Sequence, residues 1–144
     1  MRIVISDPKT GKSYQAELPA EKESSLVGLK IGDAMEGALV GAAGYKMQIT
    51  GGSDKEGFPM RSDVSGTRRI RILIAGKPGF RAKEHGIRKR KAVRGNVVSD
   101  AIAQLNTIIT EAGATPLEQI FPPKPKKEGE KKEEKGKGGK KAKK

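Results

Sequence analysis

The sequence contains no cysteine, no tryptophan and a single histidine, His85, among its 144 residues. Without thiols the chain has no means to form disulfides, zinc–thiolate centres or a cysteine nucleophile. His85 lacks the second ligand of a metal site and the partner of a catalytic pair. We therefore expect no enzymatic activity, no catalytic residues, no metal, no cofactor and no small-molecule substrate.

Aromatic side chains and long apolar segments are also scarce. Three phenylalanines and two tyrosines are too few for the platforms on which many RNA-binding modules stack bases. No apolar run approaches the ~20 residues of a membrane-spanning helix. The N-terminus carries a charge at Arg2 and too short an apolar stretch for a signal peptide. These absences indicate no membrane partner and are compatible with a cytoplasmic setting.

Positive charge is abundant and unevenly distributed. The formal net charge is +13, of which residues 1–67 carry −1, residues 68–94 carry +10, residues 95–121 carry −3 and residues 122–144 carry +7. Proteins that use charge only for solubility mix both signs over the surface. A nearly neutral body with two basic segments is instead typical of nucleic-acid binding proteins.

The internal basic segment, residues 77–95, contains eight Lys or Arg residues and one acid, Glu84. Its prolines and glycines interrupt both helical and strand periodicity, so we predict a loop. A loop of like charges repels itself and is expected to become ordered on an acidic partner. RNA phosphates suit this role because each neutralised phosphate releases a counterion. The alternative is a solvated loop without a specific partner.

A predicted strand at residues 67–75 leads into this loop. Ile70, Ile72 and Ile74 alternate with Arg69 and Arg71, so one face is apolar and the other presents arginines beside a leucine. Arginine binds phosphate with two parallel hydrogen bonds, whereas lysine acts as a point charge. Such contacts position a protein on folded RNA more than they read bases. The candidate rRNA-binding residues are Arg69, Arg71, Lys77, Arg81, Lys83, Arg88, Lys89, Arg90, Lys91 and Arg94.

Short strands dominate the rest of the expected fold. Alternation and turn residues predict strands at residues 2–6, 13–18 and 45–50. The glycines of residues 28–44 are too frequent for a long helix and suit strand ends, bulges and barrel corners. Residues 51–60 are interpreted as a shaped turn whose Phe58 and Met60 dock into the core.

The C-terminal part contains one segment that local propensity leaves open. Apolar residues in 98–109 fit a helix face, while the β-branched cluster at residues 107–110 favours a strand. A short helix is predicted after Thr115, before Pro122. Residues 122–144 carry no large apolar side chain and are predicted to be disordered.

Two patterns that resemble functional motifs are rejected. The T-G-K-S run at residues 10–13 has Ser6 where a phosphate-binding loop needs its first glycine, and a strand follows it. Asp54 and Glu56 lack the ligand order of a calcium-binding EF-hand loop. We interpret these two acids as part of a structural turn.

Two segments together resemble ribosomal protein S6e, a family of the archaeal and eukaryotic small ribosomal subunit. They are I-T-G-G-S-D-K-E-G-F-P-M-R at residues 49–61 and G-I-R-K-R-K-A-V-R-G at residues 86–95. The resemblance covers about residues 1–121, and the compact length resembles archaeal members. Eukaryotic members continue into a C-terminal helix with serines that are phosphorylated. In this sequence the last serine is Ser99, so we expect no phosphorylation switch of that kind in the C-terminal segment.

The resemblance implies a structural constituent of the small subunit that binds and stabilises folded rRNA in translation. It also implies contacts with other ribosomal proteins and, in some ribosomes, with a large-subunit protein. The family favours a strand at residues 105–111 and a short helical turn at residues 99–103. The expected fold is mainly β with short helices (α+β): a single β-barrel-like domain over residues 1–121 with the basic loop 77–95, followed by the disordered tail 122–144.

Two other functions compete with this interpretation. A DNA-binding architectural protein also combines a small body with basic arms, but it needs a wedge residue or a strand ribbon for the minor groove. Outside Phe80 the sequence shows no such wedge. A protein-interaction module on an exposed face of the barrel is the third interpretation, and its binding would survive high salt.

Overall fold

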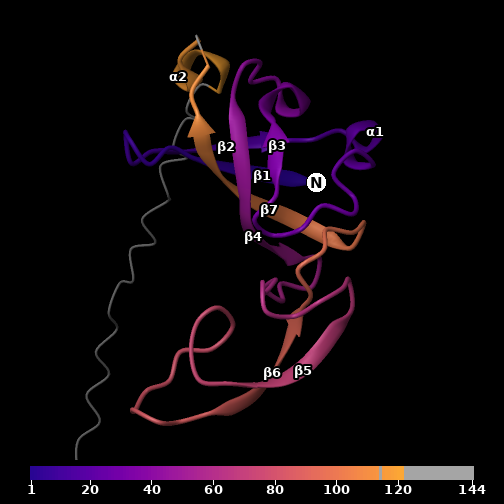
Figure 1. Ribbon diagram of the computed structural model, residues 1–144, viewed down its shortest axis with the longest axis vertical. Helices are drawn as coiled ribbons and strands as arrows, with labels where there is room; N and C mark the ends of the chain where they lie inside the picture. Colours follow the sequence, from indigo (N-terminus) through magenta and orange to yellow (C-terminus); the bar gives the residue numbers. More distant parts are fainter. Residues whose placement is uncertain (114, 122–144) are drawn as a thin grey trace, which may run out of the picture.

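The structure is a computed structural model and describes residues 1–113 and 115–121. The mainly β class with short helices is confirmed (Figure 1). The predicted disordered segment, residues 122–144, lies outside the described residues. The elements in chain order are β1 Arg2–Ser6, β2 Ser13–Glu17, α1 Ala20–Glu23, β3 Ala34–Glu36, the 3-10 helix η1 Gly37–Val40, β4 Lys46–Asp54, β5 Arg69–Ile74, β6 Lys89–Arg94, β7 Ile102–Glu111 and α2 Leu117–Ile120.

Five strands form the main sheet in the order β2-β1-β7-β4-β3. β1 pairs antiparallel with β2 and parallel with β7, and β4 pairs antiparallel with β7 and with β3. The expected barrel does not close, because the sheet ends at β2 on one side and at the three-residue β3 on the other. The body is therefore an open sheet.

The core covers one face of this sheet. Ile3 and Ile5 of β1, Met47 and Ile49 of β4 and Leu105 of β7 are almost completely buried. These residues alternate with more exposed ones, as the period of two in a half-buried strand requires. The apolar run of β1 and the alternation along β2 therefore predicted these strands correctly. For β4 the alternation predicted the first part, and the strand continues to Asp54.

The segment that propensity left open is the central strand β7. The β-branched side chains of residues 107–110 favour this outcome, because β7 lies between β1 and β4 along much of its length. The short helical turn expected at residues 99–103 is instead a turn in which the Ile102 N–H donates to the Ser99 carbonyl at 2.9 Å. The strand starts at Ile102 directly after it.

The prediction for residues 51–60 is confirmed in part. Met60 packs in the core, whereas Phe58 is half-buried outside both core clusters. The turn is confined to residues 55–59, because strand β4 continues to Asp54. The short helix α2 forms where it was predicted, after Thr115 and before Pro122, and α1 is a second helix of four residues. Within the described residues, no helix combines the length and the apolar character needed to cross a membrane.

β5 and β6 form a second, two-stranded sheet, which lies at the opposite end of the molecule from α2 (Figure 1). Residues 75–88 connect them as a long loop. The prediction of a loop over residues 77–95 is wrong for its last third, because Lys89–Arg94 is strand β6. Lys and Arg occupy positions on both faces of β6, which hides the alternation that normally reveals a strand.

Candidate nucleic-acid interface

The register of the β5–β6 hairpin sorts its side chains onto two faces. Residues directly opposite one another in an antiparallel pair share a face, and successive residues alternate. Arg71 lies opposite Ala92, and Leu73 lies opposite Arg90. We call the face formed by Arg69, Arg71, Leu73, Arg90, Ala92 and Arg94 the arginine face, and the face formed by Ile70, Ile72, Ile74, Lys89, Lys91 and Val93 the isoleucine face.

The isoleucine face is partly covered by a small second core. Ile74 and Val93 are buried with Val64, and Ile72 and Phe80 pack against them. Ile70 lies on the same apolar face of β5, but it is 43% exposed. Since Phe80 is held in this cluster, it is not the free wedge that an architectural DNA-binding protein would need.

Asp54 fixes the base of the hairpin to the main sheet. This residue ends β4 and is only 3% exposed. Its Oδ1 accepts the N–H groups of Glu56 at 3.0 Å and Phe58 at 2.8 Å. Its Oδ2 accepts Arg69 Nη2 at 2.7 Å and lies 3.6 Å from Arg94 Nη1. Because Arg69 begins β5 and pairs with Arg94 at the end of β6, one carboxylate holds both strands.

Arg69 is further enclosed by its neighbours. Its Nη1 donates to Glu56 at 2.5 Å, and its guanidinium lies 4.3 Å from the centre of the Phe58 ring. Such cation–π contacts add to the ion pair. The interpretation of Asp54 and Glu56 as structural acids therefore agrees with their contacts to Arg69.

These contacts also set the ionisation of the acids. Burial of Asp54 favours its neutral form, but hydrogen bonds from the Phe58 N–H and from Arg69 outweigh it, and the pKa of Asp54 is lowered. The hydrogen bond from Arg69 lowers the pKa of Glu56 as well. Two carboxylates thus remain charged beside the hairpin base and balance its two arginines.

Arg69 and Arg94 therefore differ from the other candidate residues. The sequence places Arg69 on an outward face, whereas its charge is balanced within the protein. Arg94 also donates to Ser99 Oγ at 3.2 Å, and its side chain is 13% exposed. The sequence contained one indication that some arginines would be neutralised within the protein. Asp54 and Glu56 lie close in sequence to the basic residues 68–94, and both form ion pairs with arginines of this range.

The other eight candidates share one exposed region. All are exposed, and none forms an ion pair with a carboxylate of the described residues. Arg68, which sequence reasoning did not select, is also exposed beside β5. These eight are Arg71, Lys77, Arg81, Lys83, Arg88, Lys89, Arg90 and Lys91.

The loop at residues 75–88 is attached to the body near its start. Arg61 donates from Nη1 to the Pro78 carbonyl at 3.1 Å, and it also forms an ion pair with Asp63 at 2.8 Å. Together with the packing of Phe80 this anchors the first part of the loop. The exposed cations are therefore presented from a hairpin tied down at its base and at the start of its loop.

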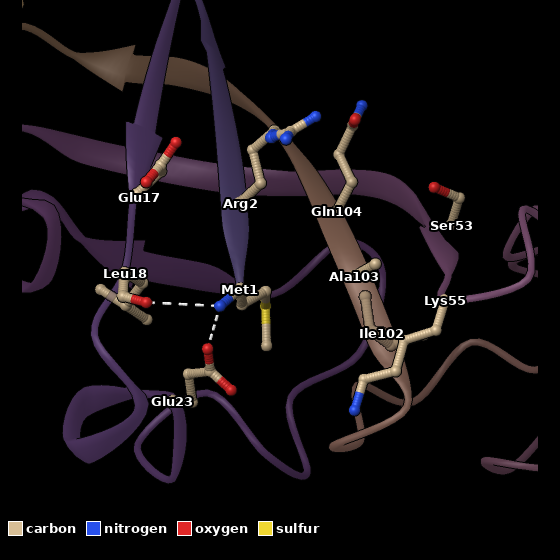
Figure 2. Close-up of a pocket in the computed structure, with 10 residues that line it drawn as sticks. All are labelled: Met1, Arg2, Glu17, Leu18, Glu23, Ser53, Lys55, Ile102, Ala103 and Gln104. Carbon is tan, nitrogen blue, oxygen red and sulfur yellow. Dashed lines mark hydrogen bonds and ion pairs between the residues drawn. The ribbon is translucent and has the colours of Figure 1, made fainter.

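A polar hollow beside β1 offers no comparable chemistry (Figure 2). The Met1 ammonium group forms an ion pair with Glu23 and donates to the Leu18 carbonyl at 3.3 Å. The residues that line the hollow carry both signs of charge, with Arg2 and Lys55 among the cations. Within the described part of the chain, no group of three His, Cys, Asp or Glu residues is arranged to hold a metal ion.

Comparison with known proteins assigns the chain to a family. The family model described as ribosomal protein S6e matches residues 1–122. The small ribosomal subunit protein eS6 of Archaeoglobus fulgidus is 50% identical over 121 residues, which cover 83% of this chain and 94% of the relative. The protein of the same name from Methanothermobacter thermautotrophicus is 48% identical over 120 residues, which cover 83% of this chain and 94% of the relative. That of Thermoplasma acidophilum is 50% identical over 116 residues, which cover 81% of this chain and 93% of the relative. A match over most of the chain and relatives at this identity show that the chain belongs to the ribosomal protein S6e family.

Proposed function

We propose that this protein is a structural constituent of the small ribosomal subunit and that its β5–β6 hairpin binds and stabilises folded rRNA. The observation that carries the proposal is the set of eight exposed cations without an internal acidic partner among the described residues, gathered on one projecting hairpin. The relatives named as small-subunit proteins support the assignment to the ribosome, and hence to the cytoplasm.

RNA is the partner that suits this surface. Exposed Lys and Arg side chains on an extended loop can follow a phosphate backbone, and each contact releases a counterion. The cations at residues 88–91 are consecutive, so they offer a dense row of positive charge. Arg69 and Arg94 have a different role in the proposal: they position the hairpin through Asp54 and do not contact phosphates directly.

The proposed unit is residues 1–121, with other ribosomal proteins as further partners. A large-subunit protein is one partner that the family resemblance suggests, but no particular residue of this chain is assigned to it. The proposal includes no enzymatic reaction.

The competing DNA-binding function gains one feature from the structure, because β5 and β6 form a strand ribbon. The candidate wedge residue is lost, because Phe80 packs against the second core. A protein-interaction module would bind with little dependence on salt, whereas a phosphate contact weakens steeply as salt rises. The nature of the bound partner and its salt dependence therefore separate the three functions.

Crosslinking in cell extract followed by sucrose-gradient fractionation tests the proposal. We expect the tagged chain to migrate with the small subunit and its crosslinks to cluster on a few rRNA helices, from peptides within residues 77–91. Replacing Lys89, Arg90 and Lys91 by Gln should reduce this incorporation. The matched control replaces three exposed lysines of the body, Lys9, Lys22 and Lys30, by Gln. Migration with nucleoid DNA, or no ribosomal peak, would reject the proposal.

A further inference from the structure

Leu73 is an exposed apolar residue in the middle of the arginine face. Its exposed fraction is 57%, the highest among the exposed large apolar side chains of the described residues. Arg90 lies directly opposite it on β6, and Arg71 precedes it by two positions on the same face of β5. Both arginines are exposed, so the apolar side chain is flanked by cations along the strand and across it.

The flanking charge identifies the kind of partner that covers Leu73. Two exposed guanidinium groups beside an apolar side chain would stay unneutralised against a purely apolar partner. They are complementary to a surface that combines negative groups with apolar ones. RNA offers this combination, since phosphates lie on either side of the C–H groups of its riboses.

The arginine face lacks the aromatic side chains that stack on unpaired bases. Phe58 lies beneath the Arg69 guanidinium, and Phe80 packs against the second core. Recognition of splayed single strands relies on such aromatic surfaces. The face is therefore better suited to the outside of an RNA helix than to its bases.

The grooves of an RNA helix differ in what they admit. The major groove of A-form RNA is deep and narrow and is closed to side chains, so a two-stranded ribbon does not enter it. The minor groove is wide and shallow and presents riboses with their 2′-hydroxyl groups. A two-stranded ribbon with a central leucine and lateral arginines matches this groove in chemistry, and a wide, shallow groove leaves room for it.

We propose that the arginine face of the β5–β6 hairpin lies on the minor groove of a double-helical RNA segment, with Leu73 against riboses and Arg71 and Arg90 on the flanking phosphates. This inference rests on the proposed function, because it specifies which face of the hairpin meets the rRNA and which RNA surface it meets. The cations of residues 77–89 then extend the contact beyond the groove.

The two contact types predict different responses to salt. Loss of an apolar contact lowers affinity without changing counterion release, whereas loss of one phosphate contact reduces the slope of log K against log salt by about one. The chain offers matched controls for Leu73. Ile70 is 43% exposed on the isoleucine face, and Val27 is 44% exposed on the body.

The experiment measures binding of the purified full chain to a short RNA duplex, to a DNA duplex of the same sequence and to one of the RNA strands, each over a series of salt concentrations. We expect Leu73→Ala to weaken binding to the RNA duplex about tenfold at every salt concentration with an unchanged slope. Arg71→Ala and Arg90→Ala should each weaken binding and reduce the slope. The affinities of Ile70→Ala and Val27→Ala for the RNA duplex should stay within about twofold of the parent, since these changes remove no contact with RNA.

Several results would overturn the inference. If Leu73→Ala behaves like Val27→Ala while the arginine variants weaken binding, the minor-groove contact of Leu73 is wrong but rRNA binding by the hairpin stands. A stronger effect of Ile70→Ala would assign the contact to the isoleucine face.

Equal or tighter binding to the DNA duplex or to the single strand would contradict the choice of RNA surface. Loss of ribosome incorporation by Leu73→Ala with unchanged RNA binding would assign Leu73 to a protein partner. If none of the arginine variants changes RNA binding, the proposed function itself fails.

Discussion

At the scale of single residues, the contacts of Asp54 decide which arginines are free. Arg69 and Arg71 are two positions apart on the same face of one strand. The first is bound by Asp54 and Glu56, whereas the second is exposed without an acidic partner among the described residues. The same residue type in the same strand therefore has two environments: Arg69 positions the hairpin, and Arg71 is available for the proposed contact with rRNA.

Replacing Asp54 by Ala should destabilise the fold strongly. The change removes a buried carboxylate that accepts hydrogen bonds from two backbone N–H groups and from Arg69. The loss leaves two backbone N–H groups without their acceptor and Arg69 with only the exposed Glu56 as a partner, and we expect a cost of about 3 kcal/mol in the free energy of unfolding. Urea unfolding monitored by circular dichroism measures it.

Asp63→Ala is the control for this change. Asp63 also pairs with an arginine, Arg61, but its side chain is 55% exposed. An exposed pair contributes at most about 1 kcal/mol. Equal effects of the two substitutions would show that Asp54 is no more important than a surface acid.

The stabilising effect of Asp54 should also depend on pH. Because the pKa of its carboxyl is lowered in the folded protein, its contribution is fully present above the unfolded pKa of about 3.9 and is lost as the pH falls through the folded pKa. The difference in unfolding free energy between the parent and Asp54→Asn should therefore shrink below about pH 4. Urea titrations between about pH 3 and pH 7 measure this difference. A difference that stays constant or grows on acidification would contradict the assignment.

At the scale of elements, the hairpin depends on a close approach of two backbone segments where β6 ends. A Cβ added to Gly95 would lie 1.9 Å from the Gly66 carbonyl oxygen. The Gly95 N–H donates to the Arg68 carbonyl at 3.1 Å, and the Gly66 N–H donates to Asn96 Oδ1 at 3.3 Å. The segment before β5 and the end of β6 are thus packed backbone against backbone.

Gly95→Ala should consequently destabilise the protein by about 2 kcal/mol or more, because the backbone must move to accommodate the methyl group. The control is Gly76→Ala in the loop of the hairpin. A Cβ added to Gly76 would meet no atom within 4 Å, and the φ of this residue is not positive. We expect its substitution to change the unfolding free energy by no more than about 0.5 kcal/mol. Thermal unfolding of both variants measures the contrast, and similar midpoints would argue against the close approach.

At the scale of the whole molecule, a nearly neutral open sheet carries a strongly basic hairpin. Among the described residues, this separation places most of the positive charge that can interact with a polyanion at one end of the structure (Figure 1). Binding to rRNA should therefore weaken steeply with salt, while folding of the body depends on its apolar core.

Neutralisation of roughly six to eight phosphates by the hairpin predicts a slope of log K against log salt of about −4 to −7. Filter binding of the full chain to small-subunit rRNA at several salt concentrations measures it. Lys89→Gln should reduce the magnitude of the slope by about one, and Lys9→Gln on the body should leave it unchanged. A slope near zero would favour the protein-interaction function instead.

Local sequence patterns are sufficient to predict four of the strands, the family and the segregation of charge. Strands β1, β2 and β5 and the first part of β4 were predictable, because short apolar runs and the alternation of apolar and polar residues are local properties that follow from the geometry of a strand. The resemblance to the family followed from two short motifs, and the net charge of residues 68–94 follows directly from their composition.

Which cations lack an acidic partner and where the sheets end depend on how distant segments of the chain pack together. The pairing of Asp54 with Arg69 joins residues 15 positions apart, and the register of β5 with β6 brings Leu73 opposite Arg90 across a long loop. Neither follows from local periodicity, because each depends on which segments pack together. The open edges of the main sheet and the strand character of Lys89–Arg94 depend on such non-local pairing too.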